Sequence, residues 1–177
     1  MTKDALIELL KSGKIDEFNQ FRRDNPNAEI DFSGVDFSGV DFSGFFLLQS
    51  LVNFKGINFR SAIFRGADLQ KASFRDCNLQ NADFSGAYLE SAYFVNAILI
   101  VANFRGARCN LANFAGAKLD DANFKGAELR KAVFASVNLQ CVELSGAELF
   151  QASLEGAKMS KQQIAMLPEL LGIVEDK

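Results

Sequence analysis

The amino-acid sequence predicts an all-β solenoid, because three periodicities coincide in it. A large apolar residue stands at every fifth position from Phe54 to Met159, and a small apolar residue stands two positions before each of these. The other three positions of the five are mostly polar. Phenylalanine also alternates with leucine or cysteine at the large position from Phe64 to Phe134. A period of five fits neither a helix nor a long strand, and such units bury their apolar side only by stacking.

The alternation of large residues sets the length of one coil. We call each large apolar residue a centre; there are 22 centres from 54 to 159, of which ten are Phe, ten are Leu, and the others are Cys109 and Met159. If like residues stack on like, a coil spans a multiple of ten residues. Ten residues are too few to enclose side chains, and fifteen would place Phe on Leu. The sequence therefore predicts four sides of five residues, or about 20 residues per coil.

The residue two positions after each centre should form a corner. On alternate sides, starting from Phe54, this residue is Gly at eight of eleven positions, and on the other sides it is never Gly. Glycine tolerates positive φ, whereas branched side chains resist it. We therefore expect two kinds of corner. Positive φ is predicted at Gly66, Gly86, Gly106 and Gly126 but not at Val101, Leu111 and Lys131.

The repeated motif A(D/N)(F/L)xx, over about residues 30–161, resembles that of the pentapeptide-repeat protein family. The resemblance implies a right-handed, quadrilateral β-helix, and the handedness comes from the resemblance alone. It carries over no catalytic residues, because the family is not defined by any.

Both ends of such a stack need a cover, since the last coil exposes unpaired backbone and an apolar cross-section. We expect short α-helical caps at both ends: a helical N-terminal cap over residues 1–29, with two helices that separate near Ser12 and Gly13, and a helical C-terminal cap over 162–177, started by Ser160. Phe150 should pack under the second cap. The β-helix should span 30–161, with a register break at 44–53, because the centres Phe42 and Phe54 are twelve residues apart.

The composition argues against catalysis. Histidine is absent, which removes the commonest general base and a common metal ligand. The carboxylates are spread over outward positions, and no glycine-rich phosphate-binding motif occurs. We expect no enzymatic activity, no catalytic residues, no cofactor and no metal site.

The three cysteines and the hydropathy indicate a cytoplasmic protein. Cys77 occupies a small inward position, Cys109 a centre and Cys141 a corner, so their positions suggest neither a disulfide framework nor a shared metal. We expect free thiols in a reducing compartment. No apolar run approaches the roughly 20 residues that cross a bilayer, and no membrane association is expected.

Outward positions that are polar almost everywhere else hold apolar or aromatic residues in one short stretch. This candidate protein-interaction patch consists of Tyr88, Tyr93, Val95, Ile98, Ile100 and Val101. Contiguous exposed apolar residues usually mark an interaction surface. We expect the side chains of Tyr93, Val95, Ile98 and Ile100 to be exposed and to be covered by a protein partner or a second copy, without direct nucleic-acid binding.

The sequence thus favours a non-enzymatic rigid scaffold or protein-protein interaction module. The alternative, implied by the resemblance to the quinolone-resistance members of the family, is a DNA mimic that inhibits or protects a type II topoisomerase. Such mimicry needs an acidic rod. Residues 53–161 contain 13 Lys or Arg and 10 Asp or Glu, a net charge of +3, so the expected β-helix lacks this field.

Overall fold

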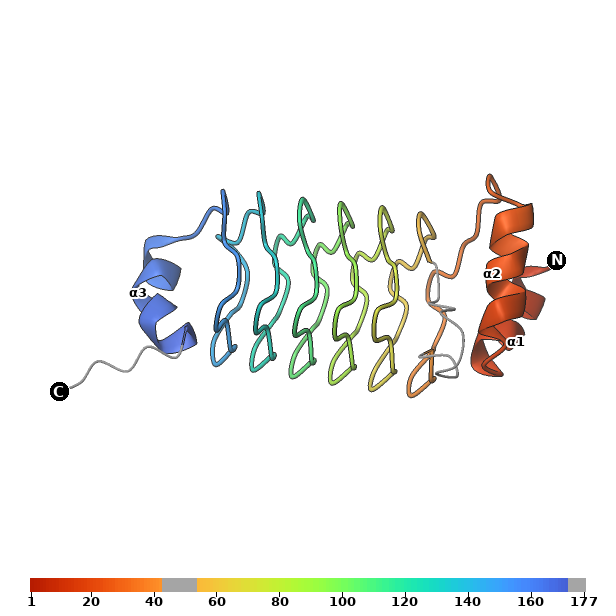
Figure 1. Ribbon diagram of the computed structural model, residues 1–177, viewed down its shortest axis with the longest axis horizontal. Coiled ribbons are helices and arrows are strands. Elements are labelled where there is room, and N and C mark those ends of the chain that lie inside the picture. The colour runs from red at the N-terminus through yellow and green to blue at the C-terminus, as the bar shows by residue number, and fades with distance from the viewer. Residues whose placement is uncertain (43–53, 172–177) are drawn as a thin grey trace.

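The computed structural model describes residues 1–42 and 54–171. It consists of a straight row of stacked coils with helices at both ends (Figure 1). Helices α1 (Lys3–Lys11) and α2 (Ile15–Asp24) lie at the N-terminal end, and α3 (Lys161–Leu170) lies at the C-terminal end. The predicted solenoid with helical ends is confirmed.

Each coil has four short sides, joined to the next coil by parallel β-bridges. From residue 54 onward the bridges join residues twenty apart, as in the series Ser73, Tyr93 and Asn113. The backbone N–H three residues after a centre donates to the carbonyl of that centre, for example from Ala102 to Leu99 at 3.0 Å. We number the four sides by the centres that they carry. Side 1 carries the centres 54, 74, 94, 114, 134 and 154. Side 2 carries the centres 59 to 159, side 3 those from 64 to 144 and side 4 those from 69 to 149, in each case every twentieth residue.

The core is a column of aromatic and aliphatic side chains, one at each centre. On side 1, the rings of Phe94 and Phe114 lie 5.0 Å apart and are inclined by 2°. Across the coil, Phe94 meets Phe104 of side 3 edge to face, at 5.6 Å and 90°. Offset stacks and edge-to-face pairs are the favoured aromatic geometries. Like residues therefore stack on like, and the coil of about 20 residues is confirmed.

The two kinds of corner predicted from the glycines do not exist. Gly66, Gly86, Gly106 and Gly126 have positive φ as expected, but Val101, Leu111 and Lys131 also have positive φ, at 58°, 61° and 57°. That part of the prediction is wrong.

The stacking of coils imposes this conformation at the corners. The N–H of Val101 donates to the carbonyl of Asp120 in the next coil at 2.9 Å. The hydrogen bond from Ala102 to Leu99 closes the same turn. Two hydrogen bonds thus outweigh the roughly 1 to 2 kcal/mol that a left-handed residue with a side chain costs. From residue 54 onward the corner glycines lie on sides 1 and 3, whereas Gly34 of the first coil lies on side 2, since Asp31 is bridged to Asn58.

The ladder of bridges is interrupted near the C-terminal end of side 2. Within the described residues, no bridge joins Lys118 to Asn138, although Asn113 is bridged to Val133 and Asn123 to Glu143 on the adjoining sides. Cys141, at the following corner, is also missing from the residues with positive φ. Val137 and Val142 occupy the small inward positions here, where most coils have alanine. Their additional methyl groups need more room inside the coil, and we attribute the missing bridge to them.

The first coil is longer than the others. Its bridges join Asp31 to Asn58 and Asp36 to Ile63, both pairs 27 residues apart, which is seven more than in later coils. These seven residues are inserted between the centres Phe42 and Phe54. The predicted break at 44–53 itself lies outside the described residues.

The N-terminal helices cover the open end of the first coil. Thr2 caps α1 by accepting a hydrogen bond from the N–H of Ala5 at 3.2 Å, as serine and threonine commonly do. Phe18 of α2 is fully buried, and its ring lies 6.4 Å from that of Phe32 and 5.9 Å from that of Phe54. The aromatic column thus continues into the helices.

The C-terminal helix closes the other end. Ser160 and Gln163 form a capping box at the start of α3, in which each side chain bonds the other residue's backbone N–H. The carbonyl of Leu170 accepts a hydrogen bond from the N–H of Leu149 in the last complete coil at 2.7 Å. Phe150, in contrast, is 50% exposed. The expectation that it packs under this helix is wrong, because α3 covers the inside of the coil and Phe150 points outward from side 4.

Candidate protein-binding surface

Three positions of each repeat can contact a partner: the residues immediately before and after the centre, and the corner. The bridges hold the residue before the centre in a column along the β-helix, at the usual spacing of about 4.8 Å between strands. Because each side chain in a column has a neighbour above and below, most residues at the position before the centre are half-buried, whereas nearly all corner residues are exposed.

The six residues of the predicted patch lie on one turn of the chain but extend over three sides. Tyr88 lies on side 4, Tyr93 and Val95 on side 1, Ile98 and Ile100 on side 2, and Val101 at the corner after side 2. Tyr88, Tyr93 and Val101 are 39%, 41% and 49% exposed.

The other three residues of the patch, Val95, Ile98 and Ile100, are half-buried. The expectation that these side chains are exposed is therefore right for Tyr93 and wrong for the other three. Their columns cover them: Ile98 is bridged to Asn78 on one side and to Lys118 on the other. Whether a partner covers the patch stays a prediction.

Tyr88 differs from the rest of the patch in its surroundings. The guanidinium of Arg108 lies over its ring at 5.0 Å, and Arg108 also pairs with Glu128 at 3.5 Å. Cation–π contacts of this kind contribute about 0.5 to 1 kcal/mol at exposed sites. Tyr88 thus belongs to a column of charged residues and not to an apolar surface.

The structure adds residues that follow the patch along side 1. Over three consecutive coils the outward positions of side 1 carry no charge: Tyr93, Val95 and Asn96, then Asn113, Ala115 and Gly116, then Val133, Ala135 and Ser136. We call these nine residues the neutral face. Every coil from residue 83 to 150 has at least one charged residue on side 3 and one on side 4. The members of one column are twenty residues apart in the sequence, so the face becomes visible only when the sequence is written in rows of twenty.

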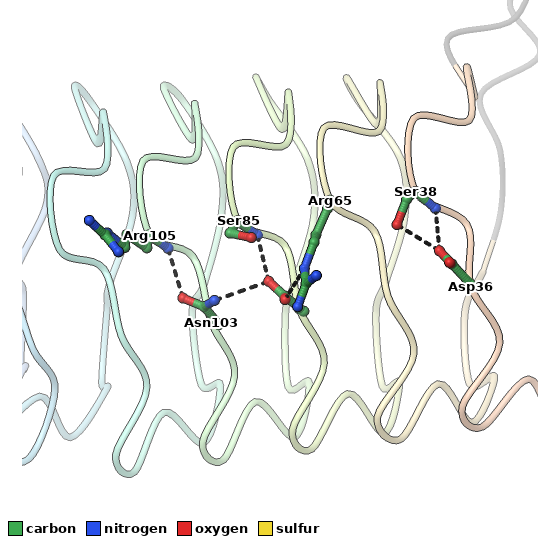
Figure 2. A network of polar contacts seen from close by, with 7 residues as sticks. Asp36, Ser38, Arg65, Ser85, Asn103 and Arg105 are labelled. Carbon is green, nitrogen blue, oxygen red and sulfur yellow. Dashed lines mark hydrogen bonds and ion pairs between the residues drawn. The ribbon is translucent and has the colours of Figure 1, made fainter.

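Side 3 shows the contrasting arrangement, in which the outward residues form a polar network. Asp83 accepts hydrogen bonds from the N–H of Ser85 and the side-chain amide of Asn103, both at 3.0 Å, and from Arg65. Figure 2 shows Arg65, Ser85 and Asn103 converging from neighbouring coils. Burial acts to raise the pKa of Asp83, but the bonds from Ser85 and Arg65 outweigh it and lower the pKa. These polar groups bind one another along the β-helix.

The described residues offer little for catalysis. A hollow of about 240 Å³ lies between the last coils and α3, lined by residues that include Cys141, Gln163 and Met166. The Cys141 side chain is exposed and makes no hydrogen bond within residues 1–42 and 54–171, so no described base activates its thiol. The same described ranges contain no group of three or more His, Cys, Asp or Glu residues that could hold a metal ion.

Two of the cysteines are structural. Cys77 and Cys109 are buried and Cys141 is exposed, and all three thiols are free, as the sequence predicted. Burial raises the pKa of Cys109, and the nearby carboxylates Glu90 and Glu128 raise it further. One carboxylate oxygen of Glu90 is buried without a hydrogen-bond partner, and burial raises the pKa of this carboxyl too. Burial therefore disfavours the charged forms of Glu90 and Cys109.

The four-sided stack and its repeat define a class of protein. The family model described as "Pentapeptide repeats" matches residues 52–81, 82–119, 107–140 and 127–161 in eight copies, which is more than half of the chain. The protein belongs to the pentapeptide-repeat family and is a right-handed quadrilateral β-helix.

Solved structures of other pentapeptide-repeat proteins resemble this chain. One is Rfr23 from the cyanobacterium Cyanothece 51142, with 24% identity, coverage of 81% of this chain and 94% of that one, and a TM-score of 0.36. A protein from the Arabidopsis thaliana thylakoid lumen has 28% identity, coverage of 79% and 75%, and a TM-score of 0.27. Full-length QnrB1, a plasmid-mediated fluoroquinolone resistance protein, has 24% identity, coverage of 83% and 85%, and a TM-score of 0.30. Comparison with curated protein sequences gives no significant match. Among the described residues, no helix has the length and apolar character needed to span a membrane.

Proposed function

We propose that this protein is a rigid, non-enzymatic protein-binding module of the cytoplasm. The observation that supports the proposal most strongly is the replacement of polar by apolar residues at outward positions of two neighbouring sides, Tyr93 and Val95 on side 1 and Ile98 and Ile100 on side 2. The inward positions between them, Phe94 and Leu99, are already fully buried. The outward residues therefore do not serve the core.

Rigidity would make this surface effective in binding. Every centre from Phe54 to Leu149 is buried, and the residues of each column are held by bridges or turn bonds. A surface that is already ordered loses little conformational entropy when a partner binds. We further propose that residues 1–29 and 162–177 are caps that keep the β-helix of 30–161 from pairing end to end, since an uncovered coil edge is a template for another chain.

Charge argues against the alternative of DNA mimicry. Duplex DNA is uniformly acidic, whereas residues 53–161 carry a net charge of +3. The acidic excess lies outside them: residues 1–52 contain 5 basic and 9 acidic residues, and 162–177 contain 1 and 3. Inhibition of supercoiling by the purified protein would nevertheless establish a topoisomerase as its target.

The proposal is tested by capturing partners with wild-type protein and with an Ile98→Asp/Ile100→Asp variant. If the two residues lie near the centre of an interface, affinity for the captured partner should fall about 30-fold, since the loss is about 2 kcal/mol. The matched control is Asn78→Asp/Gln80→Asp, which introduces the same charges at the same positions one coil earlier and should bind almost normally. Thermal melting identifies misfolding. If both variants still captured the partner and kept the wild-type melting temperature, the assignment of this surface would be disproved.

A further inference from the structure

The column of residues that follow the centres on side 1 changes in character along the β-helix. It runs Lys55, Arg75, Val95, Ala115, Ala135 and Glu155. Two basic residues therefore lie at one end, of which Lys55 pairs with Asp76 at 3.9 Å, an acidic residue lies at the other end, and uncharged residues lie between. Ala115 is the midpoint between Arg75 and Glu155, two coils from each. The column before the centres is uncharged throughout: Ser73, Tyr93, Asn113, Val133 and Ser153 form one unbroken series of bridges.

The column is complementary in charge to the same column running in the opposite direction. Consider a second copy that packs on side 1 and runs in the opposite direction. The twofold axis that relates the two copies lies in the interface, perpendicular to the long axis of the β-helix, and passes through the coil of Phe114. Each column then faces the same column of the other copy in reverse order. Arg75 meets Glu155 of the other copy, and the symmetry produces this pair twice.

The sizes of the side chains match in the same arrangement. Tyr93 lies opposite Val133 of the other copy, and Val95 lies opposite Ala135, so in both of these pairs a larger side chain faces a smaller one. Ala115 and Gly116 lie at the axis, where two copies of one residue must meet and small residues allow close approach. If the two copies pointed the same way, the column after the centres would face the column before them, and Arg75 would meet Ser73 without any opposite charge.

The two charges are also free to pair with another molecule. Arg75 and Glu155 are exposed, and neither side chain forms an ion pair or hydrogen bond within the described part of the chain. Two arginines of side 4, in contrast, are paired within the same molecule: Arg130 with Glu148 at 2.8 Å, and Arg108 with Glu128. Arg75 has no such partner, because its column neighbours are Lys55 and Val95 and the adjacent Asp76 pairs with Lys55.

We infer that the neutral face of side 1 binds a second copy of this chain, giving an antiparallel dimer with Arg75–Glu155 pairs at both ends. The inference rests on the proposed protein-binding function and names its partner. The interface uses three outward side chains on each of five coils, about 15 per copy, where a standard interface has roughly 20 to 30. The dimer should therefore be weak and depend on concentration and, through its ion pairs, on salt.

Sedimentation equilibrium between about 10 and 500 µM, at low ionic strength, tests the dimer. Arg75→Glu and Glu155→Arg should each weaken it at least tenfold, because like charges then face each other twice. The combined Arg75→Glu/Glu155→Arg variant should restore the dimer, since the pairs are re-formed with their signs exchanged. Ala115→Glu should abolish it, because two carboxylates would meet at the axis.

The matched control is Arg105→Glu, which reverses an exposed arginine at the equivalent position of side 3 and should leave dimerisation unchanged. A wild-type protein that is monomeric throughout the concentration range would overturn the inference, as would a dimer insensitive to Ala115→Glu or a charge exchange that fails to restore it. Each of these outcomes would leave the proposed function intact if partner capture remained sensitive to Ile98→Asp/Ile100→Asp, because those two residues lie on side 2.

Discussion

The side-chain amide of Gln163 donates a hydrogen bond of 2.9 Å to the backbone carbonyl of Val142. In earlier repeats, the backbone carbonyl of the residue two positions before the centre accepts a hydrogen bond from a backbone N–H twenty-one residues later. Val137, for example, accepts one from Lys158 at 2.9 Å. Residue 163 is twenty-one residues after Val142, so its side chain replaces the backbone donor that a further coil would supply. The same amide also reaches the carbonyl of Leu139 at 2.6 Å. Helix α3 thus ends the β-helix by continuing its hydrogen bonding for one more residue.

Gln163→Ala should therefore destabilise the C-terminal end. The substitution leaves the buried carbonyl of Val142 without its donor, which costs about 1 to 3 kcal/mol. Urea denaturation measures the loss, and hydrogen exchange should accelerate most in the last coils. Gln162→Ala, at the exposed neighbouring position, should change the free energy of unfolding by no more than about 0.5 kcal/mol. Equal losses in the two variants would show that helix propensity, and not the link to Val142, is responsible.

Val101→Asn should stabilise the protein. Val101 has φ of 58° at an exposed corner, and asparagine tolerates this left-handed region better than a β-branched residue does. We expect a gain of about 0.5 to 1 kcal/mol in the free energy of unfolding, somewhat less than the full cost of the region. The reverse change, Asn81→Val, tests the same corner one coil earlier, where φ is 59°, and should lose a similar amount. A loss in both variants would mean that the contacts of Val101 outweigh its backbone strain.

The contribution of Asp83 to stability should depend on pH. Its pKa in the folded protein is lowered from 3.8, so the ionised carboxylate stabilises the fold above that value and loses its effect as the pH falls through the lower, folded pKa. Asp83→Asn should cost about 1 to 2 kcal/mol at pH 7 through the weakened bonds from Ser85 and Asn103. The exposed Arg65 adds little. Denaturation of both proteins from pH 7 to pH 2 should show the difference shrinking below about pH 4.

The control for this measurement is Asp120→Asn. Asp120 is exposed, and its carboxylate has no hydrogen-bond or ion-pair partner in the portion of the chain that the structure describes. The difference between this variant and the wild type should be small at every pH. A difference for Asp83→Asn that persisted unchanged at pH 2 would contradict the role assigned to the ionised carboxylate.

Only one of the three thiols should react in the folded protein. Burial raises the pKa of Cys77 to about 12, and its thiol donates a hydrogen bond to the carbonyl of Phe54 at 2.8 Å. Burial also raises the pKa of Cys109. Since the thiolate is the reactive form, a thiol reagent at pH 8 should modify Cys141 alone, and all three cysteines only after unfolding. Cys141→Ser should abolish the reaction of the native protein; rapid labelling that survives it would mean that the coils open.

The sequence predicted the repeated parts of the molecule well. The burial of centres such as Phe104, the stacking of Phe on Phe and the coil of about 20 residues follow from the periodicity, because a residue that recurs every five positions has one environment in every coil. Helices α1 and α2 were also predictable, since the cap of Thr2 and the break at Gly13 are local signals. The conformation of Val101 and the exposure of Phe150 were predicted wrongly, because each depends on contacts with a distant part of the chain.

The sequence by itself determined the fold of this protein. The pattern of each five-residue unit determines which two side chains turn inward, and stacking of the coils is the only way to bury them. Only the tertiary structure decided what each column presents to a partner. Arg75 and Glu155 are eighty residues apart, and the midpoint between them at Ala115 has meaning only after the coils are aligned. The same alignment fixed the positive φ of Val101, because hydrogen bonds to the next coil stabilise a conformation that the residue alone disfavours.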